Sequence, residues 1–167
     1  EDTLTDAQLL LHAFNKSRLA NHIQLVRDGA EALEFLFCTG AYAGRSINHL
    51  PKLILLDLKL PKVSGREVLK QIKADPRTRM TPVVVMTSSA EHPDIDECYE
   101  LGANSYIVKP VEFNRFVSTA SDMGMYWLLL NQPSGGEYDR TSTGADQEGI
   151  RLPGIAAPAF RKRAGKA

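Results

Sequence analysis

The stretch LILLDLKLP, residues 53–61, indicates the fold of this chain. It begins with four aliphatic residues, and a continuous run of this kind is typical of a parallel strand that is covered on both faces. The run stops at a carboxylate, Asp57, and the chain then turns at Leu60-Pro61. A buried strand has no structural need for an acid at its end, so Asp57 is a candidate functional residue.

Similar runs occur elsewhere in the chain, between segments with helical patterns. We predict strands at 22–26, 52–57, 82–87 and 105–110. Helices are predicted around and between them, at 5–19, 30–37, 64–74, 93–101 and 112–130. Strands that alternate with helices form a parallel sheet with helices on both faces, and the right-handed crossover rule makes this a doubly wound α/β fold.

The composition excludes several classes of protein. The 167 residues include 20 basic and 20 acidic side chains, so no global attraction to nucleic acid or to an anionic membrane is expected. No apolar run is long enough to span a bilayer, and no export signal is visible. Cys38 and Cys98 each lie in a helix-like apolar stretch, which indicates reduced core thiols in a cytoplasmic protein.

The regular pattern ends near residue 131. Residues 131–167 are rich in Gly, Pro, Ser and Thr and show no period, so we expect a domain at 1–130 followed by a disordered tail. The tail ends in a small basic cluster, RKRAGKA. Contact with nucleic acid or with an acidic partner stays open for this cluster, but a solvated tail is the simpler interpretation.

Polar side chains end three of the predicted strands. Asp57 ends one, Thr87 ends the next, and Lys109 follows the last aliphatic run. The carboxyl ends of the strands in such a sheet share one crevice, so these side chains are expected to lie together. Glu1 and Asp2 stand just before the first predicted helix, where a preceding strand would end, and we expect them at the same crevice.

This set of side chains has the chemistry of phosphoryl transfer. Carboxylates that face each other repel, and a hard divalent cation such as Mg²⁺ relieves the repulsion through oxygen ligands. Lysine supplies a mobile positive charge, and threonine supplies a hydroxyl donor. A carboxylate nucleophile, a metal ion, a lysine and a threonine are the parts needed to place a phosphoryl group on an aspartate.

Three segments, LILLDLKLPKVSGREVL, VVVMTSS and GANSYIVKP, resemble the receiver domain of two-component response regulators. The resemblance covers about residues 1–130. It implies a flavodoxin-like parallel sheet of five strands in the order 2-1-3-4-5. It also implies that a partner histidine kinase phosphorylates Asp57, and that the domain is a signalling switch rather than a classical enzyme.

The resemblance also implies a metal site. Glu1 and Asp2 would form the acidic pair that binds Mg²⁺, together with the carboxylate of Asp57 and the backbone carbonyl of Lys59. If Glu1 and Asp2 were instead a solvated terminus, this site would lack its acidic pair.

Further residues take their roles from the same resemblance. Thr87 and Lys109 would contact the phosphoryl group, and Thr87 and Tyr106 would be the switch residues. The Lys109–Pro110 peptide bond would be cis, which a proline makes energetically accessible.

A subgroup of the family is also indicated. The segment EALEFL, the inserted loop that holds Tyr42, and the YW pair near the end of the last helix are similar to small stand-alone regulators that partner bacterial phytochromes and related hybrid kinases. This resemblance implies a homodimer through the last helix.

One feature departs from the family pattern. The first strand of a receiver precedes the acidic pair and lies in the middle of the sheet, so we expect an apolar strand upstream of Glu1. The segment GIRLPGIAAPAF is the other candidate to fill that place, but its two prolines make it a poor central strand.

Other interpretations of these residues stay open at this point. Alone, Asp57 would be expected to cap the following turn, and Tyr106 to pack in the sheet. A degenerate receiver would bind partners without phosphorylation, which the intact Asp57, Thr87 and Lys109 disfavour. A haloacid-dehalogenase-type phosphatase needs a second acid two residues after its nucleophile, and that position is Lys59.

Overall fold

A computed structural model describes residues 4–16 and 22–131 of the chain. The predicted acidic pair, Glu1 and Asp2, lies outside the described residues. The predicted tail lies outside them too, apart from Asn131, so the division of the chain near residue 130 stays a prediction.

Within the described residues, three strands form one parallel sheet in the order β1-β2-β3. The strands are β1 Ile54–Leu56, β2 Val83–Thr87 and β3 Ser105–Val108. All five residues of β2 are buried, because this central strand is paired on both edges and covered on both faces. The predicted strands at 52–57, 82–87 and 105–110 are confirmed.

The predicted strand at 22–26 is wrong, because residues 22–27 have no regular secondary structure. A strand is stable only when a neighbour takes up its backbone hydrogen bonds. This segment pairs with neither β1 nor β3, the two edge strands of the described sheet, and residues 22–24 are exposed. The described residues therefore do not form the expected five-stranded order.

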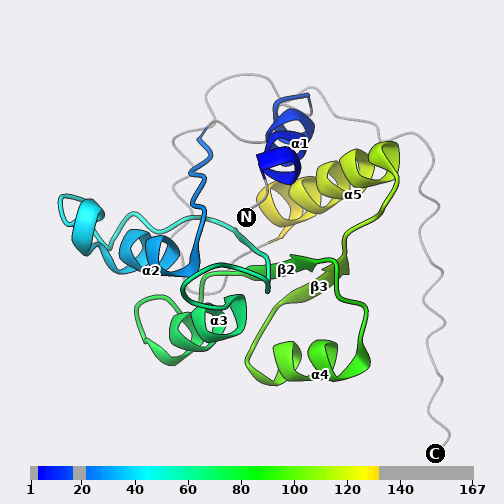
Figure 1. Ribbon diagram of the computed structural model, residues 1–167. Helices are drawn as coiled ribbons and strands as arrows, with labels where there is room; N and C mark the ends of the chain where they lie inside the picture. Colours follow the sequence, from blue (N-terminus) through cyan, green and yellow to red (C-terminus); the bar gives the residue numbers. More distant parts are fainter. Residues whose placement is uncertain (1–3, 17–21, 132–167) are drawn as a thin grey trace, which may run out of the picture. The chain divides into compact units, whose positions relative to one another are not determined.

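Helices cover both faces of the sheet, as predicted (Figure 1). On one face, α1 (Leu4–Lys16) and α5 (Phe113–Met125) pack on alternate residues of β2, and Phe14, Val84 and Phe116 are core residues there. On the other face lie α2 (Gly29–Phe37), α3 (Gly65–Ala74) and α4 (His92–Glu100), with Leu36, Leu69, Val85 and Cys98 in the core. The alternation along β2 follows from the two-residue period of a strand.

Local signals set the helix ends. Asp28 caps α2 by accepting a hydrogen bond from Glu31 N at 2.8 Å, and Ser64 caps α3 in the same way through Glu67 N. Gly102, with φ +94°, follows the end of α4.

Two predicted segments differ in detail from what was expected. The loop at 39–51 contains a single 3₁₀ turn, η1 (Gly40–Tyr42), and α5 continues into a π-helical turn, η2 (Tyr126–Leu130). Cys38 and Cys98 are both free thiols, but only Cys98 is fully buried. In the part of the chain that is described, every helix is too short or too polar to cross a membrane.

Candidate functional site

The ends of the three described strands bring Asp57, Thr87 and Lys109 together. Asp57 directly follows β1, Thr87 is the last residue of β2, and Lys109 directly follows β3. Parallel pairing places these ends at one edge of the sheet, where Lys109 N donates to Thr87 O at 2.8 Å. The ammonium of Lys109 lies 2.7 Å from Asp57 Oδ2.

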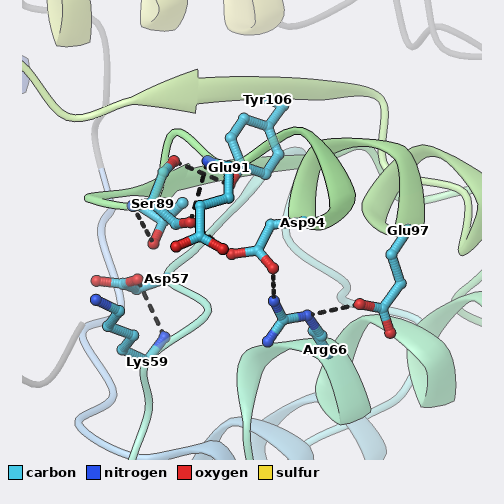
Figure 2. A network of polar contacts seen from close by, with 9 residues as sticks. Asp57, Lys59, Arg66, Ser89, Glu91, Asp94, Glu97 and Tyr106 are labelled. Atoms are coloured by element: carbon cyan, nitrogen blue, oxygen red, sulfur yellow. Dashed lines mark hydrogen bonds and ion pairs between the residues drawn. The ribbon is translucent and has the colours of Figure 1, made fainter.

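Asp57 is a buried, ionised carboxylate. Its residue is 8% exposed, and Lys59 N donates to Oδ1 at 3.2 Å (Figure 2). Burial raises the pKa of Asp57, but hydrogen bonds from Lys109 and Lys59 N, the positive charge of Lys109 and the Thr87 hydroxyl outweigh it, so the pKa lies below its usual value. The carboxylate is therefore in the form that a nucleophile requires.

Asp6 is a site residue that the sequence analysis missed. It lies in the first turn of α1, and its Oδ2 is 2.9 Å from Lys109 Nζ. Lys109, with a 9% exposed side chain, thus bridges Asp6 and Asp57. No local sequence pattern predicts this contact, because Lys109 lies 103 residues away along the chain.

Thr87 and Tyr106 are linked through Ser89, in the loop between β2 and α4. Thr87 is fully buried, and its Oγ1 accepts a hydrogen bond from Ser89 N at 3.5 Å. The Tyr106 hydroxyl donates to Ser89 O at 3.0 Å (Figure 2). Burial raises the pKa of Tyr106, more than its hydrogen bond to Ser89 lowers it, so the phenol is neutral at physiological pH. Tyr106 therefore contacts the loop that follows Thr87.

Gly65 lets helix α3 approach the backbone of Asp57. A Cβ atom at this position would come 2.0 Å from Asp57 O, closer than any real contact. Gly65 N donates to Leu58 O at 3.0 Å, which ties the start of α3 to the loop after β1. The close approach fixes the backbone that carries Asp57.

The Lys109–Pro110 peptide bond is trans, so the predicted cis bond is wrong; the described residues contain no cis peptide bond. Lys109 reaches Asp57 from the trans form, which proline favours by about 0.5–1 kcal/mol in the absence of other constraints.

The described residues hold part of the donor set that Mg²⁺ requires. Asp57 and the Lys59 carbonyl offer hard oxygen atoms, and Asp6 adds a carboxylate on the other side of Lys109. No group of three or more His, Cys, Asp or Glu residues that could hold a metal ion occurs among residues 4–16 and 22–131. The oxygen chemistry fits the metal, while the predicted acidic pair, Glu1 and Asp2, lies outside the described residues.

With this geometry in place, the comparisons with known proteins identify the family. The response regulator receiver domain family matches residues 1–121. The chain belongs to this family. Receiver domains are signalling switches that work with histidine kinases, and their fold is the flavodoxin-like one seen here in its parallel sheet and two helical layers.

Two curated relatives show how this chain sits in the family. It is 41% identical over 135 residues to the probable methanogenesis regulatory protein FilR2 of Methanothrix harundinacea, covering 81% of this chain and 84% of the relative. It is 36% identical over 128 residues to the response regulator Rcp1 of Synechocystis, covering 77% of this chain and 85% of Rcp1.

Solved receiver structures resemble this one. The Mn²⁺-bound form of Rcp1 superposes with a TM-score of 0.74 at 34% identity, covering 80% of this chain and 94% of that one. The phosphorylated cyanobacterial phytochrome response regulator RcpA gives 0.75 at 38% identity with the same coverage. The predicted resemblance to receivers, and to regulators of bacterial phytochromes among them, is confirmed.

Proposed function

We propose that this chain accepts a phosphoryl group on Asp57 from a partner histidine kinase and signals by a change of conformation. The observation that carries the proposal is the buried, ionised carboxylate of Asp57 held 2.7 Å from the ammonium of Lys109. Burying an ion pair costs desolvation free energy, so stability alone does not explain this pair at a strand end. A phosphoryl acceptor, in contrast, needs both the carboxylate and the ammonium.

The transfer itself is a substitution at phosphorus. A carboxylate oxygen of Asp57 forms the new P–O bond while the bond from phosphorus to the donor imidazole nitrogen breaks, and the freed imidazole takes up a proton. Lys109 neutralises charge on the phosphoryl oxygens, and Thr87 donates its hydroxyl to one of them. The Lys59 amide holds the second carboxylate oxygen during the step.

A bound Mg²⁺ would neutralise charge between the acceptor carboxylate and the incoming phosphoryl group. We propose Glu1, Asp2, Asp57 and the Lys59 carbonyl as its ligands. The Mn²⁺-bound state of Rcp1 supports a divalent ion at such a site in a similar receiver.

The output surface would be the face made by α4, β3 and α5. Large apolar side chains are exposed on or beside these elements: Tyr99 on α4, Val108 at the end of β3, Val111 and Phe113 around the start of α5, and Tyr126 just after α5. A new phosphoryl group would draw Thr87 inward, Ser89 would follow, and Tyr106 would reorient as its acceptor moves. Partner proteins would then meet a changed surface.

The partner and the assembly are part of the same proposal. The likeness to RcpA supports a phytochrome-type or hybrid histidine kinase as the cytoplasmic phosphodonor, while FilR2 carries the name of a methanogenesis regulator. Exposed Leu129 and Leu130, beyond α5, support a homodimer through this end of the helix.

Incubation with Mg²⁺ and acetyl phosphate tests the function. The native chain should gain one phosphoryl group by intact mass, and Asp57→Asn should gain none. Asp122→Asn, which changes an exposed acid on α5, is the matched control and should be phosphorylated like the native chain. Phosphorylation of Asp57→Asn would contradict the proposal, and steady release of phosphate from many substrates would indicate a phosphatase instead.

A further inference from the structure

A second polar network connects helix α3 to the loop that follows Thr87. Arg66, in the first turn of α3, pairs through Nη2 with Asp94 Oδ1 in the first turn of α4. Arg66 Nε forms an ion pair with Glu97 Oε2 at 2.9 Å, without the geometry of a hydrogen bond. Figure 2 shows Asp94 between Arg66 and Ser89. Two helices that are separate in the sequence are thus joined beside the site.

Ser89 is the point where this network meets the site. Its hydroxyl donates to Asp94 Oδ2, its amide donates to Thr87 Oγ1 at 3.5 Å, and its carbonyl accepts from Tyr106 at 3.0 Å. Every polar group of Ser89 is therefore used. A shift of Thr87 moves the Ser89 amide, and the Ser89 hydroxyl then has to leave or strain its contact with Asp94.

The pair of charges behind Ser89 is partly shielded from solvent. The side chains of Arg66 and Asp94 are 33% and 21% exposed. The hydrogen bond from Ser89 and the charge of Arg66 hold the pKa of Asp94 below its usual value against the effect of burial, so the carboxylate is ionised. A charged acceptor makes the Ser89 hydrogen bond stronger than a neutral one.

We propose that Arg66 is a positioning residue that, through Asp94, holds Ser89 and the loop after Thr87 in the resting arrangement. The inference rests on the proposed phosphorylation of Asp57, because the network has a regulatory effect only if Thr87 moves toward a phosphoryl group. Interactions that favour one of two states shift the population toward it, so loss of the Arg66 contact favours the other state.

The first test compares rates of phosphorylation. Arg66→Met should accept phosphate from acetyl phosphate roughly 5-fold faster than the native chain, since coupling of this kind is commonly worth that factor. Arg66→Lys keeps a cation beside Asp94 and should return to about the native rate. Arg77→Met removes the exposed pair with Asp75, which does not touch the loop, and is the matched control with an unchanged rate.

The second test identifies the route. Ser89→Ala cuts the network one step nearer the site while leaving the Arg66–Asp94 pair intact, and it should also speed phosphorylation. Because both changes act through one chain of contacts, the double variant should be no faster than the faster single variant. Additive effects would overturn the proposal, as would Arg66→Met and Ser89→Ala variants that fold normally and react at the native rate.

A measurement without phosphodonor separates this inference from the proposed function. The backbone amide signals of Ser89 and Tyr106 in unphosphorylated Arg66→Met should lie between their positions in the resting and phosphorylated native chain. If the native chain is phosphorylated on Asp57 and these signals do not move in the variant, only the positioning role of Arg66 fails. If the native chain takes no phosphate on Asp57, the proposed function fails and the inference fails with it.

Discussion

The loops after β1 and β2 both carry site residues, yet different forces hold them. After β1, Gly65 N donates to the carbonyl of buried Leu58 at 3.0 Å, so backbone contacts fix the position of Asp57. After β2, residues 88–90 make no backbone–backbone hydrogen bond with any residue that the structure describes. Hydrogen bonds between Ser89 and the side chains of Thr87, Asp94 and Tyr106 hold this loop instead. The carboxylate of Asp57 thus lies on a fixed loop, whereas the loop after β2 can open at lower free-energy cost.

The largest effect should come from removing the charge that both regions share. Lys109→Met leaves Asp57 buried without its ammonium partner and would remove a proposed contact to the phosphoryl group, so phosphorylation by acetyl phosphate should slow by about 100-fold or more. Lys70→Met, an exposed lysine on α3, should react at the native rate. A Lys109→Met rate close to native would mean that Lys109 has no part in the transfer.

A substitution at Gly65 should disturb the fixed loop after β1. Gly65→Ala places a methyl group 2.0 Å from Asp57 O, so the loop has to shift, and the free energy of unfolding should fall by about 1–3 kcal/mol. Urea unfolding measures this change, and phosphorylation should slow because the acceptor moves. Gly44→Ala is the control, because no atom lies within 4 Å of the added carbon. Equal stability of the two variants would contradict a fixed first loop.

A substitution at Tyr106 should make the loop after β2 more mobile. Tyr106→Phe removes the hydrogen bond to Ser89 O, which should cost about 0.5–1.5 kcal/mol or less in urea unfolding. Amide exchange at 88–91 should become faster, whereas Tyr99→Phe, on the exposed side of α4, should leave it unchanged. Unchanged exchange in Tyr106→Phe would show that the tyrosine does not hold the loop.

The smallest effect is a pH dependence. Burial raises the pKa of Tyr106 above its ordinary 10.0, so the folded state favours the neutral phenol. This contribution to stability is complete below the ordinary value and is lost as the pH rises through the raised one. Between about pH 8 and about pH 11 the native chain should therefore lose more stability than Tyr106→Phe. If urea unfolding shows the same loss of stability in the native chain and in Tyr106→Phe, the Tyr106 hydroxyl is solvated in the folded state and the account is contradicted.

Features that follow from local sequence patterns could be predicted, whereas features that depend on distant contacts could not. The meeting of Asp57, Thr87 and Lys109 was predictable, because aliphatic runs mark parallel strands and parallel strands end at one edge. That residues 22–26 form no strand was not predictable from these residues alone, since pairing depends on a neighbour far along the chain.

Two site-related residues were missed for a similar reason. Asp6 and Arg66 act through partners 103 and 28 residues away in sequence, and no local pattern specifies such contacts. Glu1 and Asp2 stay predictions.

Hydrogen exchange before and after phosphorylation tests the central claim most directly. In the native chain treated with Mg²⁺ and acetyl phosphate, we expect phosphate on Asp57 and changed exchange at residues 87–91 and Tyr106, with residues 58–65 unchanged. Asp57→Asn under the same treatment should show neither change. Exchange that changes at 58–65 while 87–91 stays constant, or the absence of phosphate on Asp57, would contradict the account.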